Sequence, residues 1–166
     1  IEVRVHPTLI ANDHPLSQVN GSFNAVYLHG HACKEMMLQG RGAGDLPTAS
    51  AVVGDILHAA TVDVHVHPTF VNSANADASL VFTNDWKTRY FLRLSIQDEP
   101  GSLAKIATWL SSEQVSIATM MQKAELAGSR VPLIIITHEA NEQAIRAALA
   151  KFDPEVCTVE NICLLY

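Results

Sequence analysis

The chain has 166 residues, of which 48% are apolar and 17% are charged, and its formal net charge at neutral pH is −6. This composition supports a buried core, and the acidic balance argues against a nucleic-acid partner, whose phosphates require a basic surface. No apolar run approaches the roughly 18 residues of a membrane-spanning helix, and the N-terminus lacks the basic, apolar and small-residue succession of a signal peptide.

The first predicted elements lie within residues 1–60. Apolar residues alternate over 1–5, which predicts a strand that ends at His6-Pro7. Two further strands are predicted over 23–28 and 34–39, with a tight connection at His29-Gly30-His31. Because the chain begins inside a predicted strand without an initiator methionine, we expect it to be a piece of a longer protein.

A glycine segment, Gly40-Arg41-Gly42-Ala43-Gly44, precedes a predicted helix whose apolar stripe is Val52, Val53, Ile56, Leu57 and Ala60. Glycines permit positive φ and close backbone approach, and the N–H groups at a helix start favour a phosphate or a carboxamide oxygen. The segment lacks the GxGxxG spacing of a dinucleotide-binding loop and the ending of a Walker A loop. From these residues alone, a strand-to-helix turn that needs small residues is the simpler interpretation.

Residues 61–86 lose helical periodicity and gather Asn, Ser, Asp and Ala, which predicts a linker. Within it, His65 and His67 would face one side of an extended strand, as metal ligands sometimes do. No third ligand accompanies them, so we expect no metal site.

Residues 87–166 show the clearest pattern. Strands are predicted over 90–96, 115–121, 131–137 and 156–165. Two amphipathic helices are marked by Leu103, Ile106, Ala107 and Leu110, and by Ile145, Ala148, Leu149 and Phe152. The order is βαββαβ, the ferredoxin-like arrangement. The predicted fold class is therefore α+β, with a partial mixed α/β tail followed by a ferredoxin-like domain.

The three cysteines, Cys33, Cys157 and Cys163, have no CxxC spacing. Cys157 and Cys163 are six residues apart on one predicted strand, about 20 Å, and cannot bridge within it. We expect reduced thiols in a cytoplasmic protein.

Residues 90–166 resemble the ACT domain family. The resemblance rests on Leu94-Ser95-Ile96-Gln97-Asp98-Glu99-Pro100-Gly101-Ser102-Leu103, on Val115-Ser116-Ile117 and on Leu164-Leu165-Tyr166. It implies a small amino-acid-binding module that pairs side by side with a second copy. In that family, ligands lie where the first turn and helix start of one copy meet the neighbouring copy.

By this resemblance, the expected effector-binding residues are Asp98, Gly101, Ser102, Leu103 and Ser116. The backbone N–H groups from Gly101 to Leu103 would suit an α-carboxylate at a helix start, and Asp98 would pair with the α-ammonium. The family often has Asn at the position of Asp98. The alternative for Asp98 is a cap of the turn without any ligand.

The first region resembles the C-terminal end of the catalytic domain of homoserine dehydrogenases. The matching segments are Val5-His6-Pro7-Thr8-Leu9-Ile10, Val19-Asn20-Gly21-Ser22-Phe23-Asn24-Ala25-Val26, and the glycine segment with Pro47-Thr48-Ala49-Ser50-Ala51-Val52-Val53-Gly54-Asp55. The resemblance implies a catalytic-domain tail at 1–60, a linker at 61–86 and an ACT regulatory domain at 87–166.

This second resemblance also implies the chemistry of the full-length protein, an oxidoreductase of threonine, methionine and isoleucine biosynthesis. It would interconvert L-homoserine and L-aspartate 4-semialdehyde with NAD(P). In that family the glycine segment lines the nicotinamide cofactor site, which reverses the preference for a simple turn. Gly44, Gly42 and Ala43 are therefore the expected cofactor contacts.

The same resemblance implies that this chain does not catalyse alone. The dinucleotide-binding domain, the catalytic lysine and the acidic substrate residues of the family precede the stretch that matches Ile1. Lys34, the sole lysine within residues 1–60, lies outside any matching motif. We assign no catalytic residue and expect no cofactor bound to the chain.

L-threonine is the expected allosteric effector, because it is the pathway end product that such domains commonly sense, and a homo-oligomer through the ACT domains is the expected assembly. Two alternatives stay open. One is a free-standing amino-acid sensor without chemistry, and the other is an ACT domain that only dimerises.

Overall fold

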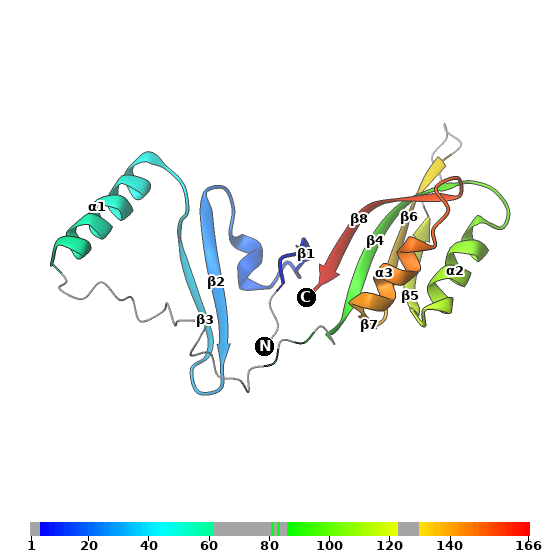
Figure 1. The fold of residues 1–166 in the computed structure, drawn as a ribbon, viewed down its shortest axis with the longest axis horizontal. Helices are drawn as coiled ribbons and strands as arrows, with labels where there is room; N and C mark the ends of the chain where they lie inside the picture. Colours follow the sequence, from blue (N-terminus) through cyan, green and yellow to red (C-terminus); the bar gives the residue numbers. More distant parts are fainter. Residues whose placement is uncertain (1–3, 62–80, 82, 84–85, 123–129) are drawn as a thin grey trace. The chain divides into compact units, whose positions relative to one another are not determined.

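The computed structural model describes residues 4–61, 81, 83, 86–122 and 130–166. The chain divides into two compact units, one formed by Ile1–Leu9 with Val81–Tyr166 and the other by Ile10–Leu80 (Figure 1). The predicted linker, with His65 and His67, lies almost wholly outside the described residues.

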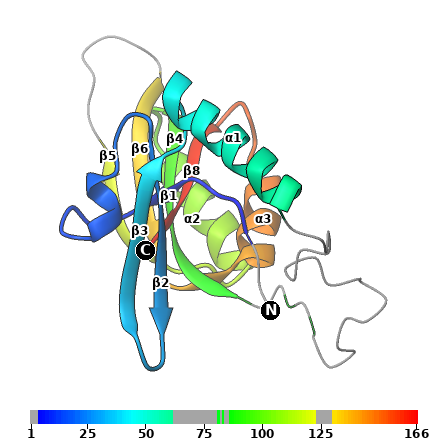
Figure 2. The same ribbon diagram turned by 90° about the vertical axis from the view of Figure 1, so that its left-hand side faces the viewer.

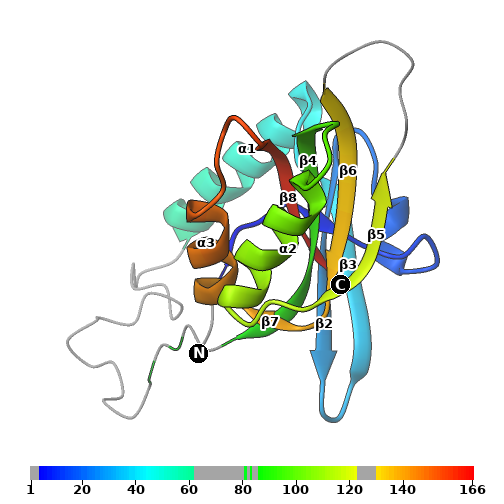
Figure 3. The ribbon, with the colours of Figure 1, turned by 90° about the vertical axis from the view of Figure 1, so that its right-hand side faces the viewer.

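The first unit is a sheet with two helices on one face (Figure 3). Its strand order is β1-β8-β4-β6-β5, and a short strand β7 pairs with the start of β4. The elements are β1 (Thr8–Leu9), β4 (Lys87–Gln97), α2 (Ser102–Ser112), β5 (Ile117–Gln122), β6 (Arg130–Thr137), β7 (Ala140–Asn141), α3 (Glu142–Ala150) and β8 (Cys157–Leu165). The main elements follow the predicted βαββαβ order, which confirms the α+β fold class.

The core of this unit is formed by strands in which buried and exposed residues alternate. Every second residue of β4 and β6 is buried, and the helices contribute stripes at helical spacing. The fully buried side chains include Leu92, Leu94, Ile96, Ile106, Leu110, Leu133, Ile135 and Ile145. The polar side chain of Thr137 is also fully buried, and its hydroxyl accepts a hydrogen bond from the Tyr90 N–H at 3.0 Å. Burying these apolar faces is the main stabilising contribution to the unit.

The first described strand, β1, lies beyond the predicted strand range 1–5. Residues 1–3 lie outside the described part, Arg4 and Val5 are not in a strand, and the paired residues are Thr8 and Leu9, parallel to the end of β8. The carbonyl of Pro7 accepts from the Leu164 N–H at 3.0 Å, which proline can do although it has no N–H of its own. Thr8 and Leu9 thus belong to the sheet of the first unit.

Arg4 anchors the same segment to the first unit. Its guanidinium lies 4.7 Å from the ring centroid of Trp86, a cation–π contact, and it forms an ion pair with Glu142 at the start of α3. A sequence pattern gave no sign of these partners, because each is more than 80 residues away.

The second unit contains a 3₁₀ turn η1 (Pro15–Gln18), an antiparallel hairpin of β2 (Phe23–Gly30) and β3 (Lys34–Arg41), and α1 (Asp45–Thr61) (Figure 2). The hairpin was predicted, but its connection is shifted. His29 and Gly30 still pair, with Glu35 and Lys34, so the turn lies at residues 31–33. The non-glycine residue that leaves the turn, Lys34, has a φ of 58°.

The second unit has almost no interior of its own. No residue of α1 is buried, and its predicted stripe is exposed, with Ile56 at 61% and Leu57 at 60%. The hairpin likewise exposes Val26 and Leu38. Apolar stripes of this size are normally covered in a folded protein.

Candidate functional site

The glycine segment forms the turn between β3 and α1. The Gly42 N–H donates to the carbonyl of Ser22 at 2.8 Å, and a Cβ at Gly42 would collide with the side-chain amide of Asn24. Gly44 has a φ of +126°, and its carbonyl accepts the first helical bond, from Thr48 at 3.1 Å. Gly44 is therefore required by the local backbone, whatever ligand the segment binds, whereas Gly42 leaves room for the Asn24 side chain.

The three predicted cofactor contacts are consecutive and exposed. Gly42 lines a shallow hollow of about 360 Å³ along the hairpin, together with Asn24 and Arg41, whereas Ala43 and Gly44 do not line it. Asp45 follows in the first turn of α1. Its carboxylate at the positive end of the helix disfavours a phosphate there and leaves a neutral carboxamide as the better partner.

The turn after β4 positions most of the predicted effector residues. Gly101 has a φ of +97° and is the N-cap of α2, and its carbonyl accepts from the Lys105 N–H at 3.0 Å. Ser102 is buried while Leu103 is exposed. A left-handed residue before the helix is a conformation that glycine adopts without strain, so the Pro100-Gly101 pair fixes the helix start.

Asp98 bonds to β5. Its carboxylate accepts from the side-chain amide of Gln122 at 3.1 Å, which ties the β4–α2 turn to the last residue of β5. This contact differs from the alternative of a turn cap, in which the carboxylate would accept from a backbone N–H of its own turn.

Ser116 lies at the opposite end of β5. Its carbonyl accepts from the His138 N–H at 2.9 Å, and Gln122 follows six residues later, a separation of about 20 Å along a strand. Within one chain the structure therefore brings Asp98, Gly101, Ser102 and Leu103 together but not Ser116.

Sequence reasoning missed a cavity of about 650 Å³ beside Ser102. Three segments form it: the β4–α2 turn with the start of α2, the first residue of β6, and the turn between α3 and β8. Its lining residues are Gln97, Glu99, Pro100, Ser102, Lys105, Arg130, Asp153, Pro154, Glu155 and Val156. Lys105, Arg130 and Glu155 come from separate parts of the chain, so no spacing in the sequence could have joined them.

Arg130 holds two walls of this cavity together. Its guanidinium donates to the carbonyls of Pro154 at 2.6 Å and Glu155 at 3.2 Å, and to the carbonyl of Ser95 at 3.2 Å. Hydrogen bonds from a charged donor are stronger than those between neutral groups. The guanidinium is thus committed to main-chain carbonyls.

The three cysteines differ in burial, since Cys33 is exposed, Cys157 is buried and Cys163 is half-buried. All three cysteines are free, and burial raises the pKa of Cys157 from 9.0 to about 11, with Arg130 lowering this pKa and Asp153 raising it to a smaller extent. Among the described residues there is no group of three potential metal ligands and no helix long and apolar enough to span a membrane.

Comparisons with known proteins cover both units. A family model described as homoserine dehydrogenase matches residues 1–57. The chain is 36% identical over 167 residues to a homoserine dehydrogenase of Corynebacterium glutamicum and 40% identical over 159 residues to that of Pseudomonas aeruginosa, covering 99% and 92% of this chain. A crystal structure of a homoserine dehydrogenase from Thiobacillus denitrificans aligns with a TM-score of 0.70 at 33% identity, over 99% of this chain and 39% of that one. The chain spans 37% of the length of these two curated relatives.

Proposed function

We propose that this chain, which corresponds to the C-terminal portion of homoserine dehydrogenases, joins the tail of a catalytic domain to an ACT-like regulatory domain that binds an amino acid. The observation that carries the proposal is the match to homoserine dehydrogenases across nearly the whole chain, both units included. The complete protein then interconverts L-homoserine and L-aspartate 4-semialdehyde with NAD(P).

The catalytic tail contributes backbone to the cofactor site in this proposal. Gly44, Gly42 and Ala43 precede the N-terminus of α1, where N–H groups without a helical acceptor can donate to a group with a partial negative charge. Because Asp45 disfavours a phosphate at this point, the carboxamide of the nicotinamide is the group we assign to it. This chain supplies no residue to the chemical step.

The regulatory domain would be completed by a second copy. β5 is an edge strand of the sheet, and its outer side offers unpaired backbone groups. Antiparallel pairing of two β5 strands about a two-fold axis sets the Gln122 end of one strand beside the Ser116 end of the other. Asp98, which Gln122 contacts, and Ser116 of the other copy would then face each other across the pair.

We assign L-threonine as the effector, with its carboxylate at the start of α2 and its ammonium at Asp98. A ligand that binds only the folded state stabilises it by mass action, by about 2.7 kcal/mol at a hundredfold excess over its dissociation constant. In differential scanning calorimetry of this chain, L-threonine should therefore raise the melting temperature of the regulatory domain by several degrees.

Asp98→Ala is the sharper variant for this test. It should abolish most of the threonine-dependent shift while leaving the unliganded transition nearly unchanged, since the side chain is exposed. A domain that only dimerises predicts no shift with any amino acid, and that result would remove the sensing function. A shift lost together with the fold would instead make the bond from Gln122 to Asp98 a purely structural one.

A further inference from the structure

Residues 4–9 form a strap on the β8 edge of the first unit, and backbone groups hold one end of it. The carbonyl of Pro7 accepts from the Leu164 N–H at 3.0 Å. The carbonyl of Leu9 accepts from the Tyr166 N–H at 3.1 Å. The strand pairing with β8 is limited to the two residues of β1. This end of the strap is thus fastened by a few main-chain hydrogen bonds.

The side chains of the strap add little to the core. None of residues 4–9 is buried, and the apolar side chains of Val5 and Leu9 are 97% and 42% exposed. A cavity of about 170 Å³ lies between His6 and Ile145 of α3, whereas a close-packed interface would fill such a space. Segments with few buried apolar contacts open locally, without the rest of the fold. The strap can therefore leave the sheet while the core stays intact.

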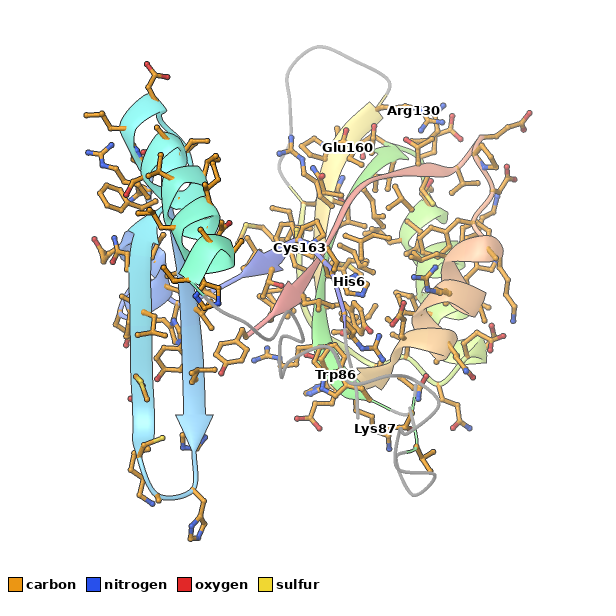
Figure 4. The ribbon with its side chains drawn as sticks, turned by 60° about the vertical axis from the view of Figure 1, so that its left-hand side comes forward. His6, Trp86, Lys87, Arg130, Glu160 and Cys163 are labelled. Atoms are coloured by element: carbon orange, nitrogen blue, oxygen red, sulfur yellow. The ribbon has the colours of Figure 1, made fainter. Side chains whose placement is uncertain are left out.

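Arg4 fastens the other end of the strap. Its guanidinium lies over the ring of Trp86 and forms an ion pair with Glu142 at the start of α3. The two charged side chains are 14% and 17% exposed, so salt screens the pair little and the loss of one partner is costly. Figure 4 shows Trp86 at the end of the sheet opposite Arg130. Arg4, Trp86 and Glu142 together form a latch.

Glu142 keeps a partner when the latch opens. Its other carboxylate oxygen pairs with Arg146, one helical turn later, at 2.6 Å, and the side chain of this arginine is 72% exposed. The carboxylate also lies in the first turn of α3, where the helix dipole favours a negative charge. Release of Arg4 therefore leaves the carboxylate paired, which lowers the free-energy cost of opening on the α3 side.

The latch also joins two distant parts of the chain. The chain leaves the first unit after Leu9 and returns to it at Val81, so Arg4 precedes the departure and Trp86 follows the return. The homoserine dehydrogenase family model that matches residues 1–57 includes the strap. One segment of that matched part is thus built into the ACT-like sheet.

We propose that the strap is a conformational device that opens and closes as one piece on this sheet, with the latch holding it shut. Through the strap, the chain that leads into the second unit is connected directly to the ACT-like domain, in addition to the linker at 61–86. A movement of α3 reaches the strap through the latch, and a movement of β8 reaches it through β1. That this domain is regulatory rests on the proposed function, whereas the opening and closing of the strap do not.

Hydrogen exchange of the whole chain, measured by NMR, tests this device. The amides of Leu164 and Tyr166 report on the strap, because strap carbonyls accept from them. The amide of Tyr90, which donates to the buried hydroxyl of Thr137, reports on the core. Arg4→Met should raise the exchange rates of the two strap-reporting amides by about tenfold or more, because the partly buried ion pair loses its cation. The exchange rate of the Tyr90 amide should not change.

Arg93→Met is the matched control. Arg93 also pairs with a glutamate, Glu160 of β8, at 2.8 Å, but this pair is exposed and lies outside the latch. Its removal should leave the exchange rates of the Leu164 and Tyr166 amides at the values of the unmodified chain. Glu142→Gln is a second test variant, which removes the negative charge of the latch at nearly constant size and should accelerate the same two amides.

The outcomes decide the proposal without any added amino acid, so they are independent of the sensing function. Acceleration that is confined to the strap-reporting amides in Arg4→Met and Glu142→Gln, and is absent in Arg93→Met, supports the device. Unchanged rates in both latch variants, or equal acceleration in Arg93→Met, overturn the latch. If Arg4→Met accelerates the Tyr90 amide equally, or does not fold, the strap is part of the core and the device is overturned.

Discussion

Arg130 and Arg93 show why the surroundings of an arginine decide its contribution to stability. Arg130 donates to three carbonyls that link β4, β6 and the turn before β8. Arg93 forms an ion pair with Glu160 at 2.8 Å, but its side chain is 52% exposed. Exposed pairs contribute about 0–1 kcal/mol, whereas hydrogen bonds that involve a charged group contribute about 1.5–3 kcal/mol.

We therefore expect Arg130→Met to lower the free energy of unfolding of the first unit by about 1–3 kcal/mol. Arg93→Met, matched in size and charge, should change it by less than about 1 kcal/mol. Urea denaturation of the two variants measures both values. Equal effects would mean that the carbonyl contacts of Arg130 contribute nothing beyond a surface charge.

Cys157 gives a prediction about thiol chemistry. Its pKa is raised to about 11 by burial, and its folded value lies above the 9.0 of the ordinary thiol. The stability that the neutral thiol contributes is thus present below about pH 9 and is lost as the pH rises towards 11.

The raised pKa also predicts slow alkylation of Cys157, because the thiolate is the reactive form of a cysteine. At about pH 8.5, iodoacetamide should modify the exposed Cys33 well before Cys157. Mass mapping of the labelled sites that shows equal rates would contradict this placement.

At the scale of elements, the two edges of the sheet differ. β1 covers the β8 edge with a two-residue parallel pairing, and no strand of the described residues pairs with the outer side of β5. β5 also exposes Met120 and Met121, at 37% and 52%. Natural sheets protect open edges with charges, so an apolar open edge favours a second strand.

Self-association through β5 should respond to a charge placed on it. Met121→Lys should weaken dimerisation in sedimentation equilibrium, because two like charges would lie close to the paired strands. Gln143→Lys, on the exposed face of α3, is the control with the same added charge. Equal dimer dissociation constants in the two variants would exclude the β5 edge as the interface.

For the whole molecule, the two units should differ in stability because their interiors differ. The first unit buries alternate residues of β4 and β6, together with residues of β7, β8 and both helices, whereas no residue of α1 is buried. Hydrogen exchange should show slow amides in β4, β6 and β8 and fast amides throughout β2, β3 and α1, because amides protected only by exposed structure open locally. Equal protection in both units would show that 10–61 has a core that its exposed side chains do not reveal.

The chain alone should not oxidise homoserine with NAD or NADP. It spans 37% of the length of its curated relatives, and it contains neither a dinucleotide fingerprint nor a residue that we assign to catalysis. A spectrophotometric assay at 340 nm, the ordinary wavelength for reduced nicotinamide, measures this. Turnover that follows the protein through repurification would refute the expectation.

The sequence by itself determined the βαββαβ unit. Alternation along β4 and β6 and the helical stripes of α2 and α3 are local periodicities, and each of them dictates one buried face. The hairpin and the helix start at Gly44 were predicted for the same reason, since turn residues act within a few positions. The glycine positions also agreed, because a positive φ at Gly101 and Gly44 is a local backbone requirement.

Only the tertiary structure decided which distant residues meet. It paired Thr8 and Leu9 with β8, because β8 offered an edge whose carbonyls and N–H groups needed partners. It separated Asp98 from Ser116 by the length of β5, and it joined Lys105, Arg130 and Glu155 around one cavity. Contacts of this kind depend on sheet order and register, which the spacing of residues along one segment does not encode.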